Sequence, residues 1–111
     1  MHAYTNIGLE AMGAQIVNHE NGDIEVVAKD GLRGADYTFS KTSVTGTANL
    51  LMAATLAKGM TVLRGAAREP EIGDLANCLR KMGAKISGID STTLTIQGRY
   101  LIHSLANCLE P

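Results

Sequence analysis

The sequence predicts an α/β fold of the mixed, α+β kind, in which one complete β-α-β-α-β-β unit follows the α-β-β end of another. The first observation behind this prediction is an internal repeat: residues 9–14 are Leu-Glu-Ala-Met-Gly-Ala, and residues 79–84 are Leu-Arg-Lys-Met-Gly-Ala. The same spacing of 70 residues places Ile24 on Leu94 and Val26 on Ile96. The other two observations are short segments of alternating apolar residues and longer segments of helical spacing that stop at glycines.

Residues 1–34 supply the incomplete unit. A helix is expected to end at Gly13 in the left-handed conformation, and a strand over 14–17 follows it. Asn21-Gly22 predicts a two-residue hairpin turn. Residues 24–26 alternate apolar, acidic and apolar, as a half-buried strand does, so they are expected to form the second arm of the hairpin.

Residues 35–98 supply the complete unit, and residues 99–111 form a divergent tail. Apolar residues at helical spacing predict a helix over 43–58 that stops at Gly59. Pro70 suits the first turn of the next helix, because its missing N–H is not needed there. The remaining expected elements are strands over 36–40, 60–63, 84–87 and 92–96.

The composition excludes several classes of function. Lys and Arg number 10 against 11 Asp and Glu, so the net charge is −1 and no basic surface for nucleic acid is expected. The longest apolar stretch, 50–57, is far shorter than the roughly 18 residues that cross a membrane. The N-terminus has no signal-peptide pattern, and Cys78 and Cys108 form no metal-binding spacing. We therefore expect a cytoplasmic protein with no nucleic-acid partner, membrane partner or metal.

Three stretches of the complete unit are distinctive. They are Lys-Thr-Ser-Val-Thr-Gly-Thr at 41–47, Ala-Ala-Arg-Glu-Pro-Glu-Ile at 66–72 and Met-Gly-Ala-Lys-Ile-Ser-Gly at 82–88. Together they resemble the enolpyruvyl transferase family, and within it the members that act on UDP-N-acetylglucosamine. The resemblance runs from residue 4 to residue 98. The related shikimate-pathway transferases share the fold but not the stretch at 66–72.

The resemblance implies a transferase of peptidoglycan synthesis. Such an enzyme moves the enolpyruvyl group of phosphoenolpyruvate onto the 3-hydroxyl of UDP-N-acetylglucosamine and releases phosphate, without a cofactor or a required metal. The full-length members have two domains of three such units each, with the active site in the cleft between them. This chain is expected to supply parts of two units of one domain, as a fragment that is inactive alone.

Two alternatives to the hypothesis of an enzyme fragment stay open. The chain could be an inert truncated product, or a module that associates with itself. The second alternative rests on the architecture, because repeat units bury their apolar faces against neighbours. Neighbours that are missing would leave apolar surface exposed.

The resemblance assigns substrate contact to Lys41, Thr42, Ser43 and Val44, which match the stretch that contacts the nucleotide part of the sugar substrate. Independently, Ser43 suits the N-cap of the following helix, and a helix start beside a lysine can hold a diphosphate. Without the resemblance, an ordinary capped helix beside a solvated lysine is the commoner explanation. One departure is that many family members have Gly directly after the matching Val, where this chain has Thr45-Gly46.

The other reactive side chains are given structural roles. Glu71 is expected to favour the helix start that it lies in, with Arg68 as a local partner. Arg64-Gly65 stands where the family commonly shows Glu-Asn, so the contacts of this loop should differ. Cys78 is expected to pack as a small hydrophobe on the helix face of Leu75 and Leu79.

Neither cysteine matches the catalytic one of the family. That cysteine lies in a Gly-rich loop before an Arg-Pro pair, and its loop is expected upstream of this sequence. Cys108 lies in the tail, where 105–109 repeats the Leu-Ala-Asn-Cys-Leu of 75–79. The sequence offers no physical explanation for that duplication.

Overall fold

The computed structural model describes residues 2–98, and in the first helix it describes the side chains from Asn6 onward. The predicted tail at 99–111 therefore lies outside the described residues. The elements follow one another in the order α1 (His2–Ala11), β1 (Gln15–Asn18), β2 (Ile24–Val27), β3 (Asp36–Thr38), α2 (Val44–Leu56), β4 (Met60–Arg64), α3 (Pro70–Lys81), β5 (Lys85–Ser87) and β6 (Thr93–Gln97).

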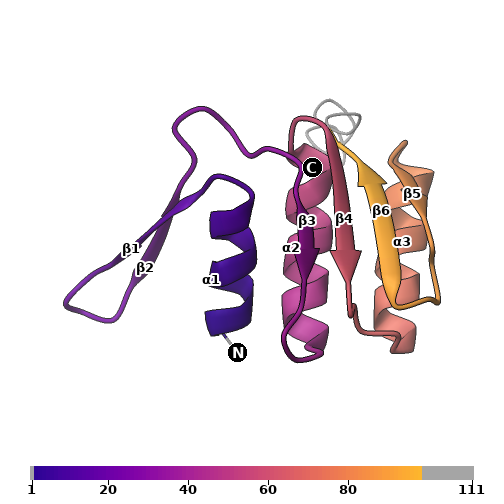
Figure 1. Cartoon of the computed structure of the whole chain (residues 1–111), viewed down its shortest axis with the longest axis horizontal. Coiled ribbons are helices and arrows are strands. Elements are labelled where there is room, and N and C mark those ends of the chain that lie inside the picture. Colours follow the sequence, from indigo (N-terminus) through magenta and orange to yellow (C-terminus); the bar gives the residue numbers. More distant parts are fainter. Residues whose placement is uncertain (1, 99–111) are drawn as a thin grey trace, which may run out of the picture.

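The strands form two separate sheets (Figure 1). β1 and β2 make an antiparallel hairpin, and the other strands make a four-stranded sheet in the order β3-β4-β6-β5. β3 and β4 run parallel, joined by α2, while β6 runs antiparallel to both of its neighbours. This mixed architecture confirms the predicted fold class.

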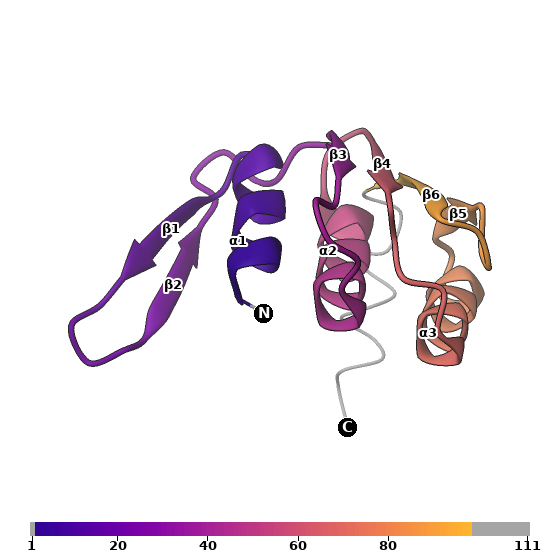
Figure 2. The same ribbon diagram turned by 60° about the horizontal axis from the view of Figure 1, so that its bottom comes forward.

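One face of the larger sheet carries the helices α2 and α3, and α1 stands between α2 and the hairpin (Figure 2). The alternation of β4 shows which side chains point toward the helices: Thr61 and Leu63 are buried, whereas Met60 and Arg64 are exposed. Leu63 belongs to a continuous core with Leu50 of α2. The helices are therefore held by apolar burial on a single face of the sheet.

Glycines end both repeated helices, as predicted. Gly13 and Gly83 have φ angles of 95° and 109°, a conformation that side chains with a Cβ rarely adopt. The equivalent helices thus end in equivalent ways before their strands. Elsewhere the strand and helix ends differ from the predictions by one or two residues, as expected for frayed ends.

The hairpin turn is longer than the sequence predicted. The N–H of His19 donates to the carbonyl of Asp23 at 2.8 Å, and that of Gly22 donates to the carbonyl of His19 at 3.0 Å. Three residues therefore connect the arms. A two-residue turn of the Asn-Gly type needs a positive φ at both positions, but here only Gly22 has one, at 93°. The Asn21 side chain instead accepts from the N–H of Asp23 at 3.0 Å.

The prediction that Cys78 packs into the core was wrong, because its side chain is exposed. The buried residues of α3 are Ile72, Ala76 and Leu79. Since each helical residue turns by about 100°, Cys78 lies that far around the helix from Leu79, at the flank of the apolar stripe. The three-residue spacing between Leu75 and Cys78 was too weak a signal to predict that Cys78 is buried in the core.

Candidate functional site

The start of α2 is capped as the sequence predicted. Ser43 has extended backbone angles, and its hydroxyl oxygen accepts a hydrogen bond from the N–H of Gly46 at 3.0 Å. The N–H of Thr47 then donates to the carbonyl of Ser43 at 2.9 Å. Ser43 thus satisfies one of the donors that a helix start leaves open and accepts the first hydrogen bond of the helix itself.

Two further donors of the helix start face a polar, accessible surface. The N–H groups of Val44 and Thr45 have no partner among the described residues. Lys41 and Thr42, which precede the cap, are exposed, and Ser43 and Val44 are half-buried. Lys41 makes no ion pair with any other described residue. Two free amides and a lysine at one helix start can stabilise a negative charge.

A buried threonine fastens this segment to the next loop. Thr47 is fully buried, and its hydroxyl donates to the carbonyl of Ser43 at 2.7 Å and accepts from the N–H of Ala67 at 3.0 Å. The hydroxyl of Thr42 donates to the carbonyl of Gly65 at 3.3 Å. The sequence alone did not predict this role of Thr47. The available signal was a threonine one helical turn after the cap, where its hydroxyl can reach the cap carbonyl.

The ring of Phe39 lies beneath the first turn of α2. A Cβ added to Gly46 would lie 3.2 Å from that ring and 3.1 Å from the hydroxyl of Ser43, so the glycine fits a tight space. Thr45, by contrast, is exposed. The residue by which this chain departs from the family pattern therefore lies on the surface of the candidate site, and Gly46 lies inside it.

Arg64, which stands where the family commonly shows Glu, forms an ion pair with Asp36. The guanidinium of Arg64 donates to both carboxylate oxygens of Asp36, at 2.8 and 3.0 Å, across the β3–β4 pair. These hydrogen bonds lower the pKa of Asp36 and raise that of Arg64. Arg68 bonds the backbone carbonyl of Asp90 at 2.8 Å. Its local partner is therefore the β5–β6 turn and not the acidic residues beside it.

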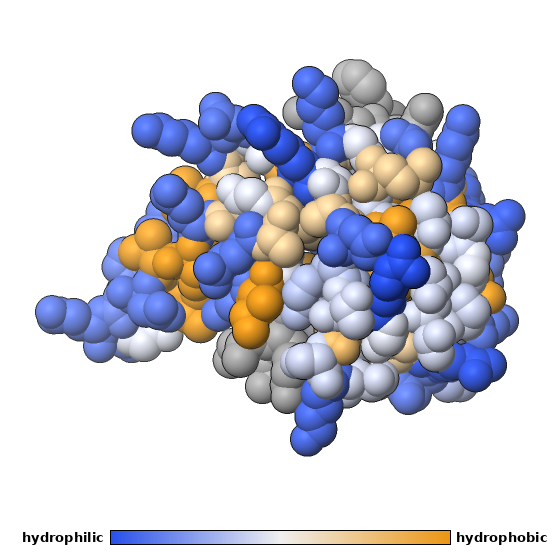
Figure 3. Space-filling model, viewed as in Figure 1, coloured by the Kyte–Doolittle hydropathy of each residue, from blue (hydrophilic) through white to orange (hydrophobic). Residues whose placement is uncertain are grey.

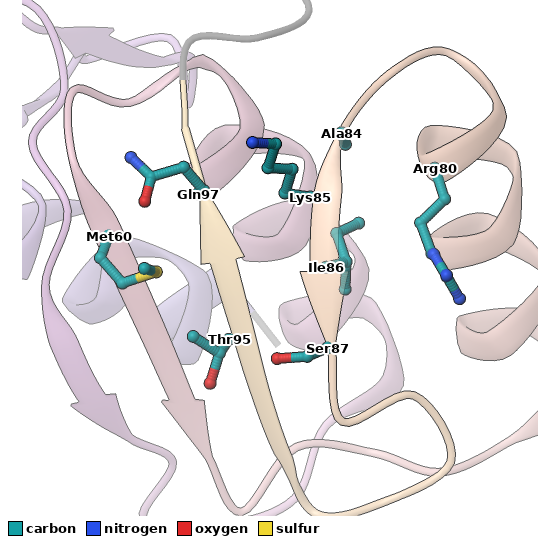
Figure 4. A pocket seen from close by; sticks show the side chains of 8 residues that line it. All are labelled: Met60, Arg80, Ala84, Lys85, Ile86, Ser87, Thr95 and Gln97. Carbon is teal, nitrogen blue, oxygen red and sulfur yellow. The ribbon is translucent and has the colours of Figure 1, made fainter.

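A pocket of about 470 Å³ lies elsewhere, around the edge strand β5 of the larger sheet (Figure 4). Its wall includes Met60 of β4, Gln97 of β6, Lys85 of β5 and Arg80 of α3. None of its lining residues belongs to the segment 41–47, so it is separate from the start of α2. The sequence did not predict it.

Two further features concern the described residues only. Among residues 2–98, no group of His, Cys, Asp and Glu side chains is placed to hold a metal ion. Within that same range, each helix is too short or too polar to cross a membrane.

Comparison with known proteins identifies the class. The family model described as EPSP synthase (3-phosphoshikimate 1-carboxyvinyltransferase) matches residues 5–107. The enolpyruvyl transferase NikO from Streptomyces tendae superposes with a TM-score of 0.79 over 89% of this chain and 25% of its own, at 18% identity. An EPSP synthase from Acinetobacter baumannii gives 0.68 over 86% of this chain and 21% of its own, at 23% identity. The chain belongs to this family of carboxyvinyltransferases.

Curated relatives narrow the resemblance within the family. The UDP-N-acetylglucosamine 1-carboxyvinyltransferase of Solibacter usitatus is 60% identical over 82% of this chain. That of Acidiphilium cryptum is 56% identical over 94% of this chain. The chain spans only 22% and 25% of the length of these two relatives. It is thus similar to a part of them, and a match of this length includes the segment 41–47.

Proposed function

We propose that this chain is the part of a UDP-N-acetylglucosamine enolpyruvyl transferase that contacts the nucleotide of the sugar substrate. Lys41, Thr42, Ser43 and Val44 are the proposed contacts. The observation that supports them is the exposed start of α2, where the amides of Val44 and Thr45 lack partners beside Lys41. The names of relatives at more than half identity supply the substrate.

In this proposal the complete enzyme moves the enolpyruvyl group from phosphoenolpyruvate to the sugar hydroxyl and releases phosphate. It does so in the cytoplasm, as a step of peptidoglycan synthesis. The described residues contribute binding and not bond chemistry: the start of α2 stabilises the charge of the diphosphate, and Thr47 holds that start in place. The division into units at 1–34 and 35–98 belongs to the same proposal.

A titration with UDP-N-acetylglucosamine, followed by amide chemical shifts, tests the contact residues. At millimolar ligand the amides of 41–47 should shift, and Lys41→Met should weaken the response by removing the charge. Lys58→Met is the matched control, since Lys58 is an exposed lysine beyond the opposite end of α2. Unchanged amides at 41–47, or equal weakening by both variants, would contradict the proposed contacts.

The chain by itself should release no phosphate from phosphoenolpyruvate in the presence of the sugar nucleotide. Neither proline of the sequence follows an arginine, so the Arg-Pro pair that marks the catalytic loop of the family is not in it. Exposed Cys78 lies in a helix and not in a glycine-rich loop. Phosphate release by the pure chain above that of a Cys78→Ala variant would overturn this account.

A further inference from the structure

The loop 65–68, which leads from β4 toward α3, lies between two other parts of the complete unit. Figure 1 shows the start of α2, this loop and the turn from β5 to β6 together at the lower end of the larger sheet. The turn consists of residues 88–92. The loop belongs to no helix or strand, so its position depends on the hydrogen bonds that it makes to its neighbours.

On one side the loop is bonded to the start of α2. The carbonyl of Gly65 accepts from the hydroxyl of Thr42 at 3.3 Å, and the N–H of Ala67 donates to the hydroxyl of Thr47 at 3.0 Å. Thr47 in turn donates to the carbonyl of Ser43 at 2.7 Å. A displacement of the loop is therefore passed on to the capped first turn of α2.

On the other side the loop is bonded to the β5–β6 turn. The N–H of Ala66 donates to the carbonyl of Thr92 at 2.9 Å, and Nε of Arg68 donates to the carbonyl of Asp90 at 2.8 Å. The other three residues of the loop are glycine and two alanines, so Arg68 has its only polar side chain. Alternate residues thus bond to the two neighbours, and the loop links them.

The turn is a firm anchor for this link. Among residues 2–98, Asp90 is the only residue other than glycine with a positive φ, at 70°. Residues with a Cβ rarely adopt that conformation, and it persists where the surroundings support it. The hydroxyl of Ser91 supports the turn, because it donates to the carbonyl of Gly88 at 2.7 Å and accepts from the N–H of Thr93 at 3.2 Å. The Asp90 carbonyl is thereby held where Arg68 can reach it.

We propose that Arg68 is a positioning residue for the nucleotide contacts. Its hydrogen bond to the turn sets where the loop lies and, through Ala67 and Thr47, where the start of α2 lies. Arg68 acts through these residues and is not itself a proposed contact. The ligand in this inference rests on the proposed function, whereas the position of the α2 start is a property of the free chain.

The donor of Arg68 matters here and not its charge. Arg68 forms no ion pair with any residue of the described part of the chain. Glutamine has an amide nitrogen as many bonds from the backbone as the Nε of arginine, and methionine has a side chain of that length without a donor. Arg68→Gln should therefore keep the link to the turn, and Arg68→Met should lose it.

Amide chemical shifts of the ligand-free chain test the positional part. Arg68→Met should move the amides of Ala67 and of 41–47, whereas Arg68→Gln should leave them close to those of the parent chain. Arg80→Met is the matched control, because Arg80 is an exposed arginine near the other end of α3. Arg68 is exposed as well, and Figure 3 shows mainly hydrophilic and neutral surface at the lower right, around the turn and the start of α3. Both Arg68 variants should therefore fold.

Titration of the same variants with UDP-N-acetylglucosamine tests the consequence for binding. Arg68→Met should raise the Kd by about threefold, which is part of the effect of one lost hydrogen bond, and Arg68→Gln should leave it near the parent value. Unmoved amides in Arg68→Met, or a glutamine variant that behaves like the methionine variant, would overturn the inference. A parent chain that does not bind the sugar nucleotide would contradict the proposed function instead, and the shifts of the free chain would still decide whether Arg68 positions the start of α2.

Discussion

At the scale of single residues, two fully buried threonines have hydroxyls in opposite circumstances. That of Thr47 makes two hydrogen bonds, to the carbonyl of Ser43 and the N–H of Ala67. That of Thr61, on the helix-facing side of β4, has no partner among the described residues. The same side chain is therefore expected to stabilise one site and to destabilise the other.

Replacing Thr47 by valine keeps the shape and removes the hydroxyl. The N–H of Ala67 is then left buried without a partner, so the free energy of unfolding should fall by about 1–3 kcal/mol. Urea unfolding measures the loss, and amide shifts at 41–44 should report a displaced loop. No loss of stability would contradict the role given to Thr47.

Thr61→Val should have the opposite sign. The hydroxyl of Thr61 is desolvated without compensation, so its removal should raise the free energy of unfolding by about 1 kcal/mol. The same urea experiment measures it, and the two variants control for each other because they make the same chemical change. A clear destabilisation would show that the Thr61 hydroxyl has a partner after all.

At the scale of elements, the Asp36–Arg64 pair joins β3 to β4 at the surface. The pKa of Asp36 lies below the ordinary value of 3.8, chiefly because Arg64 donates hydrogen bonds to the carboxylate. Desolvation of Asp36 opposes this shift, and the positive charge of Arg64 adds to it. A carboxyl with a lowered pKa stabilises the fold fully above its unfolded pKa. The contribution is lost as the pH falls through the folded pKa.

Arg64→Gln should therefore return the pKa of Asp36 toward its ordinary value. The difference in unfolding free energy between the parent chain and this variant should be constant near neutral pH and shrink below about pH 3.8. Carboxyl NMR titration and acid unfolding measure the two effects. Arg68→Gln is the control, because Arg68 bonds a backbone carbonyl and its loss should not change with pH over this range.

At the scale of the whole molecule, α1 and α2 join the two parts of the chain through a close contact. A Cβ added to Gly8 of α1 would clash with Cδ1 of Leu50 and lie 2.9 Å from its Cδ2. Leu50 is fully buried, so its side chain has little room to move. The absence of a side chain at Gly8 allows the helices to approach.

Gly8→Ala should consequently lower stability by about 1–3 kcal/mol through overpacking. In a Leu50→Ala background the same change should raise stability by about 1 kcal/mol, because the space is free and alanine favours the helix. A double-mutant cycle by urea unfolding measures the reversal. Equal effects of Gly8→Ala in both backgrounds would mean that the two helices are not packed at this point.

Local patterns predicted most of the secondary structure. The left-handed ends at Gly13 and Gly83 and the cap at Ser43 each depend on a few neighbouring residues, so the sequence was sufficient for them. The Asn21 turn and the exposure of Cys78 were mispredicted. Asn-Gly suits a two-residue or a three-residue turn, and the hydrogen bond to the Asn21 side chain favours the longer one. The spacing of Cys78 places it near the apolar face of α3, and the direction in which α3 packs leaves it exposed.

The sequence by itself determined the order of the elements, the equivalence of the two repeated segments and the helix start proposed to contact the nucleotide. These follow from the spacing of apolar residues and from backbone preferences that act over a few residues. The tertiary structure alone decided that Thr47 fastens this start to the next loop and that Ile24 and Val26 are exposed where Leu94 and Ile96 are buried. The reason is that burial depends on what packs against a strand from elsewhere in the chain. Leu94 and Ile96 share a core with Leu50 and Leu51 of α2, a helix distant from β6 in sequence.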